Sequence, residues 1–165
     1  MLNYEGIWTP WGRSQGGNPY MPGVNFYHTA GHGGLKLHKP LNDEIPAAFR
    51  NQEGWYEEDC EFAIPFYFLH GAIRDHCLKH GLQGHTMTAE DWFGKYDQAY
   101  YRHVIERYCR AACVLHFGID YSDDQLKDCF SSRAELEAEI AELQRQMPAS
   151  RPGNFTAEAL CRSSI

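Results

Sequence analysis

The stretch VNFYHTAGHGGLKLH, which spans residues 24–38, alternates apolar and polar side chains on either side of a glycine-rich centre. Alternation places every second side chain on the same face of a strand, and the first half carries β-branched and aromatic residues. Residues 24–29 and 35–38 therefore predict two strands joined by a loop at 30–34, which is a β-hairpin. We expect this hairpin, or a small antiparallel sheet built on it, to form the β part of an α+β fold.

Helical spacing begins near residue 56 and continues to residue 80. Pro65 interrupts this stretch, and a proline inside a helix costs about 3 kcal/mol. The sequence therefore predicts either a kink at Pro65 or a second helix that has this proline in its first turn. Residues 39–54 are expected to form a loop with a short helical turn at 45–50.

The second half of the chain predicts three further helices. An apolar stripe with helical spacing covers 89–116 and is followed by Gly118, a residue type that commonly ends helices. A short helix is expected at 122–129. A last helix starts at residue 132, and its apolar stripe consists of Leu136, Ile140, Leu143 and Met147. This stripe could also pair helices between two chains in a homodimer.

The composition limits the classes of function. With 165 residues, 43% of them hydrophobic, the chain can bury a core without disulfides or a metal. Its net charge of −7 argues against direct binding of nucleic acid, which needs clustered Lys and Arg. We see no signal peptide, and the longest apolar run is too short to cross a membrane. We expect a cytoplasmic protein with one domain over 1–150, in which the hairpin packs on three to four helices, and a flexible tail at 151–165.

The glycine-rich loop is the first candidate site. Gly33 and Gly34 let the backbone approach a ligand closely, and successive amides in such a loop can bind an anion. His32 at the tip could act as an acid, a base or a ligand. The alternative is a plain hairpin loop whose glycines serve only its geometry.

An acidic cluster follows two large aromatic residues, Trp55 and Tyr56, and consists of Glu57, Glu58, Asp59 and Cys60. We expect a helix here, with Glu57 and Glu61 on one face. Carboxylates in a first helical turn stabilise the helix by about 0.3–1 kcal/mol each, so capping would explain the run. Burial beside Trp55 could instead raise a carboxyl pKa toward general acid or base catalysis. In either case we expect the cluster to lie beside the glycine-rich loop, whose exposed amides a carboxylate could satisfy.

Histidines and cysteines could in principle hold zinc. His76 and His80 lie four residues apart on a predicted helix, and such a pair needs a third ligand. Cys109, Cys113 and His116 share a helical face and could supply it. Their spacing matches no zinc signature, so we expect no metal and no cofactor.

Carboxylates are concentrated in two segments of the chain. Residues 43–61 hold seven of them against Arg50, and residues 120–142 hold eight against Lys127 and Arg133. Such a surface can occupy the basic groove of a nucleic-acid-binding protein. The alternative is that these carboxylates only form solvent-exposed helix faces.

Three motifs in order carry a resemblance to one family. They are TPWG at 9–12, TAGHGG at 29–34 and GWYEEDC at 54–60. Over about residues 8–70, their order and spacing are similar to those of a small domain of unknown function found in bacteriophage and plasmid accessory proteins. The chain departs from that pattern at Gly31, where serine is expected, and at Pro65. The resemblance implies a mobile-element origin and action in the bacterial cytoplasm, but no established activity.

Two functions are compatible with these patterns. In the first, the protein inhibits a host defence system by binding a host protein, such as a component that binds nucleic acid. Its contact surface would consist of Trp11, Gly33, Gly34, Trp55, Tyr56, Glu135, Glu139 and Glu142. In the second, a small enzyme acts on a nucleotide or a nucleotide-modified target, with His32 and the Glu57–Cys60 cluster in one cleft. Hydrogen bonding of His32 to a carboxylate in an open pocket would favour the enzyme, whereas carboxylates that bond backbone amides have a structural role.

Overall fold

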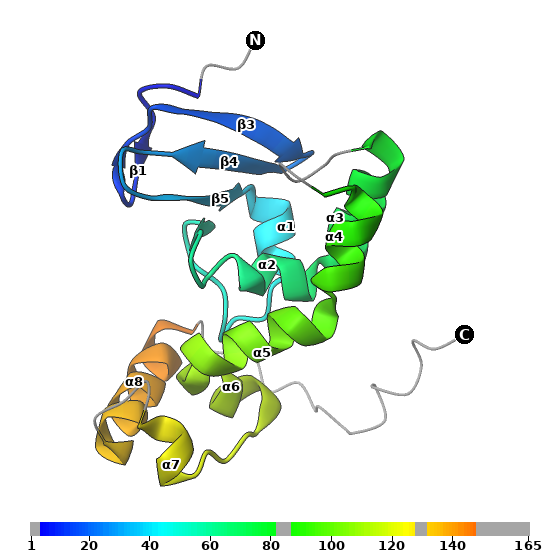
Figure 1. The fold of residues 1–165 in the computed structure, drawn as a ribbon. Helices are drawn as coiled ribbons and strands as arrows, with labels where there is room; N and C mark the ends of the chain where they lie inside the picture. Colours follow the sequence, from blue (N-terminus) through cyan, green and yellow to red (C-terminus); the bar gives the residue numbers. More distant parts are fainter. Residues whose placement is uncertain (1–3, 82–86, 128–131, 148–165) are drawn as a thin grey trace.

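A four-stranded antiparallel sheet forms the N-terminal part of the fold (Figure 1). The computed structural model describes residues 4–81, 87–127 and 132–147. The sheet contains, in spatial order, β3 (Gly16–Met21), β4 (Val24–His28), β5 (Gly33–Leu37) and β6 (Trp55–Glu57). Strands β4 and β5 pair antiparallel, which confirms the predicted hairpin. A separate ribbon of two short strands, β1 (Trp8–Thr9) and β2 (Gly12–Arg13), precedes the sheet. Only β4 and β5 were predicted.

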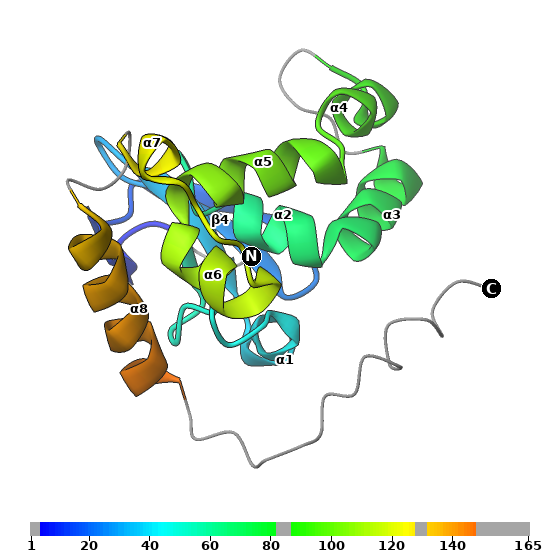
Figure 2. The same cartoon turned by 90° about the horizontal axis from the view of Figure 1, so that it is seen from below.

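The described helices lie on one side of the sheet, with α2 close beneath it (Figures 1 and 2). The fold is therefore α+β, as predicted, but the helical part is divided into more pieces than the three or four expected. The eight helices of the described residues are α1 (Lys39–Glu44), α2 (Ala63–Phe68), α3 (His70–His80), α4 (Ala89–Lys95), α5 (Gln98–Tyr108), α6 (Arg110–Phe117), α7 (Asp123–Leu126) and α8 (Arg133–Gln146).

The stretch 56–80 does not form the predicted helix at its start. Residues 55–57 pair with β5 instead, because Trp55 lies opposite Lys36 and Glu57 opposite Gly34 in the sheet. A turn follows, and α2 begins only at Ala63, so that Pro65 falls in its first turn, as one of the two alternatives predicted. Sheet pairing therefore overrides the helical spacing of residues 56–62.

The single helix predicted over 89–116 is also wrong, because the structure has α4, α5 and α6 there. The side chain of Asp97 accepts a hydrogen bond from the amide of Tyr100 at 2.9 Å, which caps a new helix at this point. A second break falls at Cys109, whose backbone is not helical. Gly118 ends α6 with a positive φ of 66°, as its type predicts.

Residues 39–54 contain a helix that was not predicted. Helix α1 begins at Lys39 with a proline in its first turn, and only turns follow it at 46–50. Helix α7 lies inside the predicted 122–129, whereas residues 128–131 and the predicted tail at 151–165 lie outside the described residues.

The core lies between the sheet and the helices. Its largest fully buried side chains include Tyr56 from β6, Leu37 from β5 and Tyr101 from α5. The stripe of α8 packs against this core within the same chain: Leu136 is buried and Ile140, Leu143 and Met147 are partly buried. Among the described residues, no helix combines the length and the apolar character that crossing a membrane requires.

Candidate functional site

The glycine-rich loop and the acidic cluster are neighbours, as predicted. Strand β5 begins in the loop and pairs with β6, which places Gly34 opposite Glu57. The amide of Glu58 donates to the carbonyl of Gly33 at 3.0 Å, so the contact continues beyond the strand. Residues 57–61, here called the acidic turn, therefore lie directly against the hairpin loop.

Two glycines of this loop are required by close packing. A Cβ atom on Gly34 would lie 2.2 Å from the indole ring of Trp11 and 2.4 Å from the carbonyl oxygen of Tyr56. A Cβ on Gly33 would lie 2.5 Å from the carboxylate of Glu58. A Cβ on Gly31, by contrast, would meet nothing within 4 Å. Gly33 and Gly34 are also buried, so their small size serves the packing of the hairpin against the acidic turn.

His32 lies near the acidic turn without a hydrogen bond to it. Its Nδ1 atom is 3.8 Å from a carboxylate oxygen of Glu57, which is beyond hydrogen-bonding distance. The side chain of His32 is 58% exposed. Its backbone closes the loop, because the amide of Thr29 donates to the carbonyl of His32 at 2.7 Å. His32 is thus a surface residue of a tight turn.

The carboxylates of the acidic turn bond mainly to backbone amides. One oxygen of Glu57 accepts the amide of Asp59 at 2.7 Å and that of Cys60 at 3.3 Å. A carboxylate oxygen of Glu61 accepts the amide of Glu57 at 3.1 Å. The expected helix with Glu57 and Glu61 on one face is therefore wrong. The carboxylates nevertheless accept hydrogen bonds from backbone amides, as capping residues do, but within a turn.

Cys60 is a poor nucleophile in this setting. Burial raises the pKa of its thiol, and the nearby carboxylates of Glu57 and Glu61 raise it further. Because the thiolate is the reactive form, a thiol with a raised pKa is less reactive at neutral pH. The raised pKa of this thiol therefore gives no support to a nucleophilic role for Cys60.

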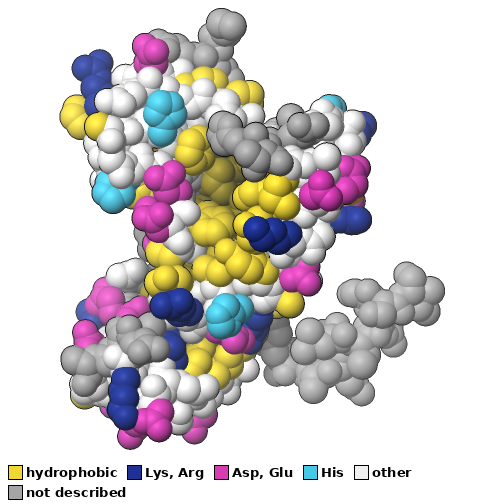
Figure 3. Space-filling model, viewed as in Figure 1, with side chains coloured by type: hydrophobic (Ala, Val, Ile, Leu, Met, Phe, Trp, Pro, Cys, Tyr) yellow, Lys and Arg dark blue, Asp and Glu magenta, His cyan; other side chains and the backbone are white. Residues whose placement is uncertain are grey.

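The acidic turn and helix α8 approach each other at Cys109. Burial is the largest of the causes that raise the pKa of Cys109 to about 12, and Glu61 and Glu139 are among the charges that add to it. Glu61 belongs to the turn, and Glu139 lies on the exposed side of α8 between Glu135 and Glu142. Glu61 and Glu139, which are distant in sequence, therefore both lie near the thiol of Cys109. Figure 3 shows acidic side chains over α7 and α8, and others beside the apolar hollow below the sheet.

Several predicted contact residues are buried. Tyr56 is fully buried, and Trp55 is buried with its ring edge-on to Trp11 at 5.8 Å between ring centroids. In this structure they pack within the sheet. The partly exposed or exposed members of the predicted surface are Trp11, Glu135, Glu139 and Glu142, and their role in binding stays a prediction.

The histidine and cysteine sets do not converge. The rings of His76 and His80 lie 4.4 Å apart on α3, whereas His116 packs against Phe49 and Phe68. Within the part of the chain that the structure describes, no three His, Cys, Asp or Glu residues are grouped so that they could hold a metal ion.

A further cleft, which the sequence did not predict, is lined by no residue of the glycine-rich loop, the acidic turn or the histidine and cysteine sets. It has a volume of about 1120 Å³ and lies between β5, α1, the segment 47–53 and the end of α8. Its basic residues include Lys36, Lys39 and Arg50. One signal was present in the sequence, because Arg50 is the single Lys or Arg among the seven carboxylates of residues 43–61.

Comparison with known proteins supplies a family but no activity. No curated protein and no solved structure matches the chain. A model of a domain of unknown function, DUF7007, matches residues 4–112, which include the sheet, the glycine-rich loop and the acidic turn. The match extends well beyond the three motifs, through α5 and into α6. The chain therefore belongs to the DUF7007 family of domains of unknown function.

Proposed function

We propose that this protein acts by stoichiometric binding of a basic protein through the acidic surface formed by the acidic turn and α8. The observation that carries the proposal is the row of carboxylates Glu135, Glu139 and Glu142 along one side of α8, and Glu61 of the acidic turn lies near enough to act, like Glu139, on the partly buried thiol of Cys109. Complementary charge speeds the encounter of proteins and rejects partners of the same charge.

Crowding of like charges on α8 supports this proposal. Glu135, Glu139 and Glu142 follow one face of the helix at helical spacing. Desolvation by its neighbours raises the pKa of Glu139, and the charge of Glu135 raises it further. A basic partner would relieve this repulsion on binding. Tyr108, which precedes Cys109 in the chain and is 52% exposed, adds an aromatic side chain of a type that is enriched at interfaces.

The resemblance to mobile-element accessory proteins gives the proposal its biological setting. A basic groove that normally holds nucleic acid is the natural target for an acidic surface. We therefore propose a nucleic-acid-binding component of a bacterial defence system as the partner, and the host cytoplasm as the place of action. Support for this setting is by analogy, because it rests on the motifs and not on the site.

The enzyme alternative has less support. His32 is exposed and is not hydrogen-bonded to Glu57, and the oxygens of Glu57 and Glu61 accept backbone amides. None of the predicted catalytic residues lines the cleft of about 1120 Å³. A general acid or base needs a reacting group within hydrogen-bonding reach in a shielded place.

A pull-down from bacterial lysate with matched charge variants tests the proposal. One variant reverses α8, with Glu135→Lys, Glu139→Lys and Glu142→Lys. The control reverses three exposed carboxylates elsewhere, with Glu44→Lys, Asp75→Lys and Glu90→Lys, and so has the same net charge. We expect the wild type and the control to retain the same basic protein, and the α8 variant to retain about tenfold less or lower still.

A second comparison addresses the enzyme alternative. His32→Ala should bind the partner and act in a host defence assay like the wild type, because charge complementarity is spread over many groups. Removal of a catalytic acid or base would instead cost about 10²–10⁴ in rate. A folded but inactive His32→Ala protein, beside a fully active α8 variant, would replace the binding proposal by the enzymatic one. Thermal unfolding of each variant controls for loss of the fold.

A further inference from the structure

The cleft beside α1 gathers positive charge on a chain whose net charge is −7. Lys36 reaches it from β5, Lys39 from the start of α1 and Arg50 from the segment after α1. Two carboxylates, Asp43 and Glu53, also line it. Its walls include the apolar side chains of Leu37, Ala47, Leu143 and Met147. The cleft therefore combines a cationic region with an apolar wall, which is the usual character of a small-molecule site.

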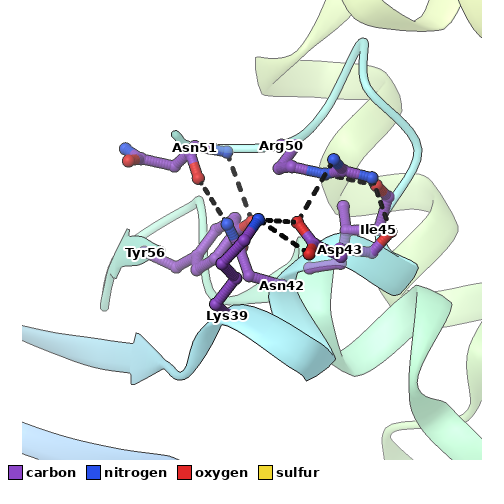
Figure 4. Close-up of polar contacts among 7 residues, drawn as sticks. All are labelled: Lys39, Asn42, Asp43, Ile45, Arg50, Asn51 and Tyr56. Carbon is purple, nitrogen blue, oxygen red and sulfur yellow. Dashed lines mark hydrogen bonds and ion pairs between the residues drawn. The ribbon is translucent and has the colours of Figure 1, made fainter. Parts of the chain in front are cut away.

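A buried polar network fixes the floor of the cleft (Figure 4). The hydroxyl of Tyr56 donates to Oδ1 of Asn42 at 2.6 Å, and the amide of Asn51 donates to the same hydroxyl at 3.3 Å. Nδ2 of Asn42 donates to the carbonyl of Asn51 at 2.7 Å. Asn42 is 4% exposed. These bonds attach the segment after α1 to both α1 and β6, so the cleft is preformed.

The cations of the cleft are held in place by weak, exposed partners. The carboxylate of Asp43 accepts hydrogen bonds from Lys39 at 2.9 and 3.1 Å and lies 3.5 Å from the guanidinium of Arg50 (Figure 4). Nε of Arg50 donates to the carbonyl of Ile45 at 2.9 Å, which fixes the guanidinium. Ion pairs this exposed contribute little to stability, so an incoming anion can compete with Asp43 at small cost.

The same arrangement selects for the charge of the ligand. A ligand with one carboxylate would only replace the carboxylate that Asp43 already supplies. A phosphate group carries more charge and three acceptor oxygens, so it can bind Lys39 and Arg50 together. Lys36 also lines the cleft, but its Nζ atom donates to the carbonyl of Glu53 and lies 4.7 Å from the centre of the Trp55 ring, so Lys39 and Arg50 are the phosphate ligands that the geometry supports.

We propose that this cleft binds a phosphate-bearing small molecule about the size of a mononucleotide, with the phosphate on Lys39 and Arg50 and the body of the ligand against Leu143 and Met147. The volume of about 1120 Å³ is sufficient for such a ligand. This site is separate from the acidic surface of the binding proposal. It can therefore be present whether or not that surface binds a protein.

Isothermal titration calorimetry with the full chain tests the site. The probes are adenosine 5′-monophosphate, inorganic phosphate and adenosine, each titrated up to millimolar concentration. We expect the monophosphate to bind, phosphate to bind more weakly and adenosine to show no saturable binding. If inorganic phosphate bound as tightly as the monophosphate, the body of the ligand would not contact the apolar wall, and the cleft would be a simple anion site.

Three variants separate this site from non-specific attraction. Lys39→Met removes an exposed cation of the cleft, and Lys79→Met removes an exposed cation of α3 as the matched control. Loss of a charge-assisted hydrogen bond should weaken the monophosphate about tenfold or more in Lys39→Met and leave Lys79→Met unchanged. Asp43→Asn removes the competing carboxylate and should tighten binding several-fold if it remains folded.

Two outcomes would overturn the proposal. One is that none of the probes binds at millimolar concentration. The other is that Lys39→Met and Lys79→Met weaken binding equally, which would indicate attraction to the surface in general. Backbone amide shifts measured by NMR on titration should change most at β5, α1 and residues 47–53; changes confined to the hairpin loop would also contradict the assignment.

Discussion

The acidic turn and the cleft beside α1 both concentrate charge, but they use it differently. In the turn, the carboxylates of Glu57 and Glu61 accept hydrogen bonds from amides of their own segment. In the cleft, the ion pairs of Asp43 join side chains at the surface, while a separate buried network of neutral groups holds the backbone. The carboxylates of the turn are held by backbone amides and support the fold, whereas the carboxylate of Asp43 is held by the side chains of Lys39 and Arg50 and can be displaced by a ligand.

Of the variants that test this comparison, a substitution at Gly34 should have the largest effect on stability. Gly34→Ala places a Cβ atom against Trp11 and the carbonyl of Tyr56, and the backbone cannot move without breaking the pairing of β5 and β6. We expect a loss of about 3 kcal/mol in the free energy of unfolding. Gly31→Ala, with open space around it, should change it by less than about 0.5 kcal/mol.

Urea unfolding of both glycine variants measures this difference. Equal stability of the two variants would mean that the hairpin and the acidic turn are not in the tight contact described here.

The second largest effect on stability should come from the polar network at the floor of the cleft. Tyr56→Phe removes the hydroxyl that bonds Asn42 and Asn51, and it leaves a buried acceptor on Asn42 without its donor. An unpaired buried polar group costs about 1–3 kcal/mol, so we expect a loss of about 2 kcal/mol. Tyr100→Phe, at a partly exposed position on α5, is the matched control and should stay within about 0.5 kcal/mol of the wild type. A Tyr56→Phe protein as stable as this control would show that the network does not hold the cleft.

The charge of the turn itself should matter less. Glu57→Gln keeps an acceptor oxygen but removes the charge that strengthens the bonds from the amides of Asp59 and Cys60. We expect a loss of about 1 kcal/mol. Asp59→Asn changes an exposed carboxylate of the same turn and should be nearly neutral. Equal losses from the two, measured by thermal unfolding, would contradict the structural role of Glu57.

The smallest expected effects are changes of stability with pH. They should have opposite signs for Asp43 in the cleft and for Glu139 on α8. The hydrogen bonds from Lys39 lower the pKa of Asp43, so its contribution to stability is present at neutral pH and is lost as the pH falls through that lowered pKa. Burial raises the pKa of Glu139, so folding is disfavoured as the pH rises through the carboxyl range.

Asp43→Asn should therefore be less stable than the wild type at neutral pH, and Glu139→Gln more stable. At about pH 3 the difference for Glu139→Gln should vanish, whereas the difference for Asp43→Asn should only shrink, because the lowered pKa of Asp43 keeps part of this carboxyl ionised. Thermal unfolding at the two pH values measures them. Differences of the same sign for the two variants would mean that the two carboxylates do not experience opposite environments.

How far the sequence predicts this fold depends on whether a signal is local. Alternation and glycines within 24–38 were sufficient for β4 and β5, because both strands and their connection are contiguous. Strand β3 carries glycines and a proline, residue types that disfavour strands, so it was not predicted. It forms at the edge of the sheet, where these residues are tolerated. Strand β6 has three residues and depends on pairing with β5, some twenty residues earlier, so helical spacing misled the prediction there.

The candidate sites follow the same distinction. The contact between the glycine-rich loop and the acidic turn was predicted, and capping of backbone amides was one of two predicted roles for the carboxylates, but which amides they bond depends on how the chain turns. The isolated Arg50 among the carboxylates of residues 43–61 was a signal for the cleft, but it could not show which residues surround it. The cleft forms from residues 36–53 and from residues 143–147, which are brought together only when α8 packs on the core.

The place where the DUF7007 match ends has a practical consequence for anyone who wishes to shorten this protein. The match stops at Ala112, in the middle of α6, where Ala111, Ala112 and Cys113 are all buried. Helix α8 packs on α6 and covers this region with the apolar side of its own stripe. A chain cut at the family boundary would therefore lose half of one helix and expose an apolar surface to solvent, which promotes aggregation. A cut that keeps residues through 147 would instead preserve the whole contact.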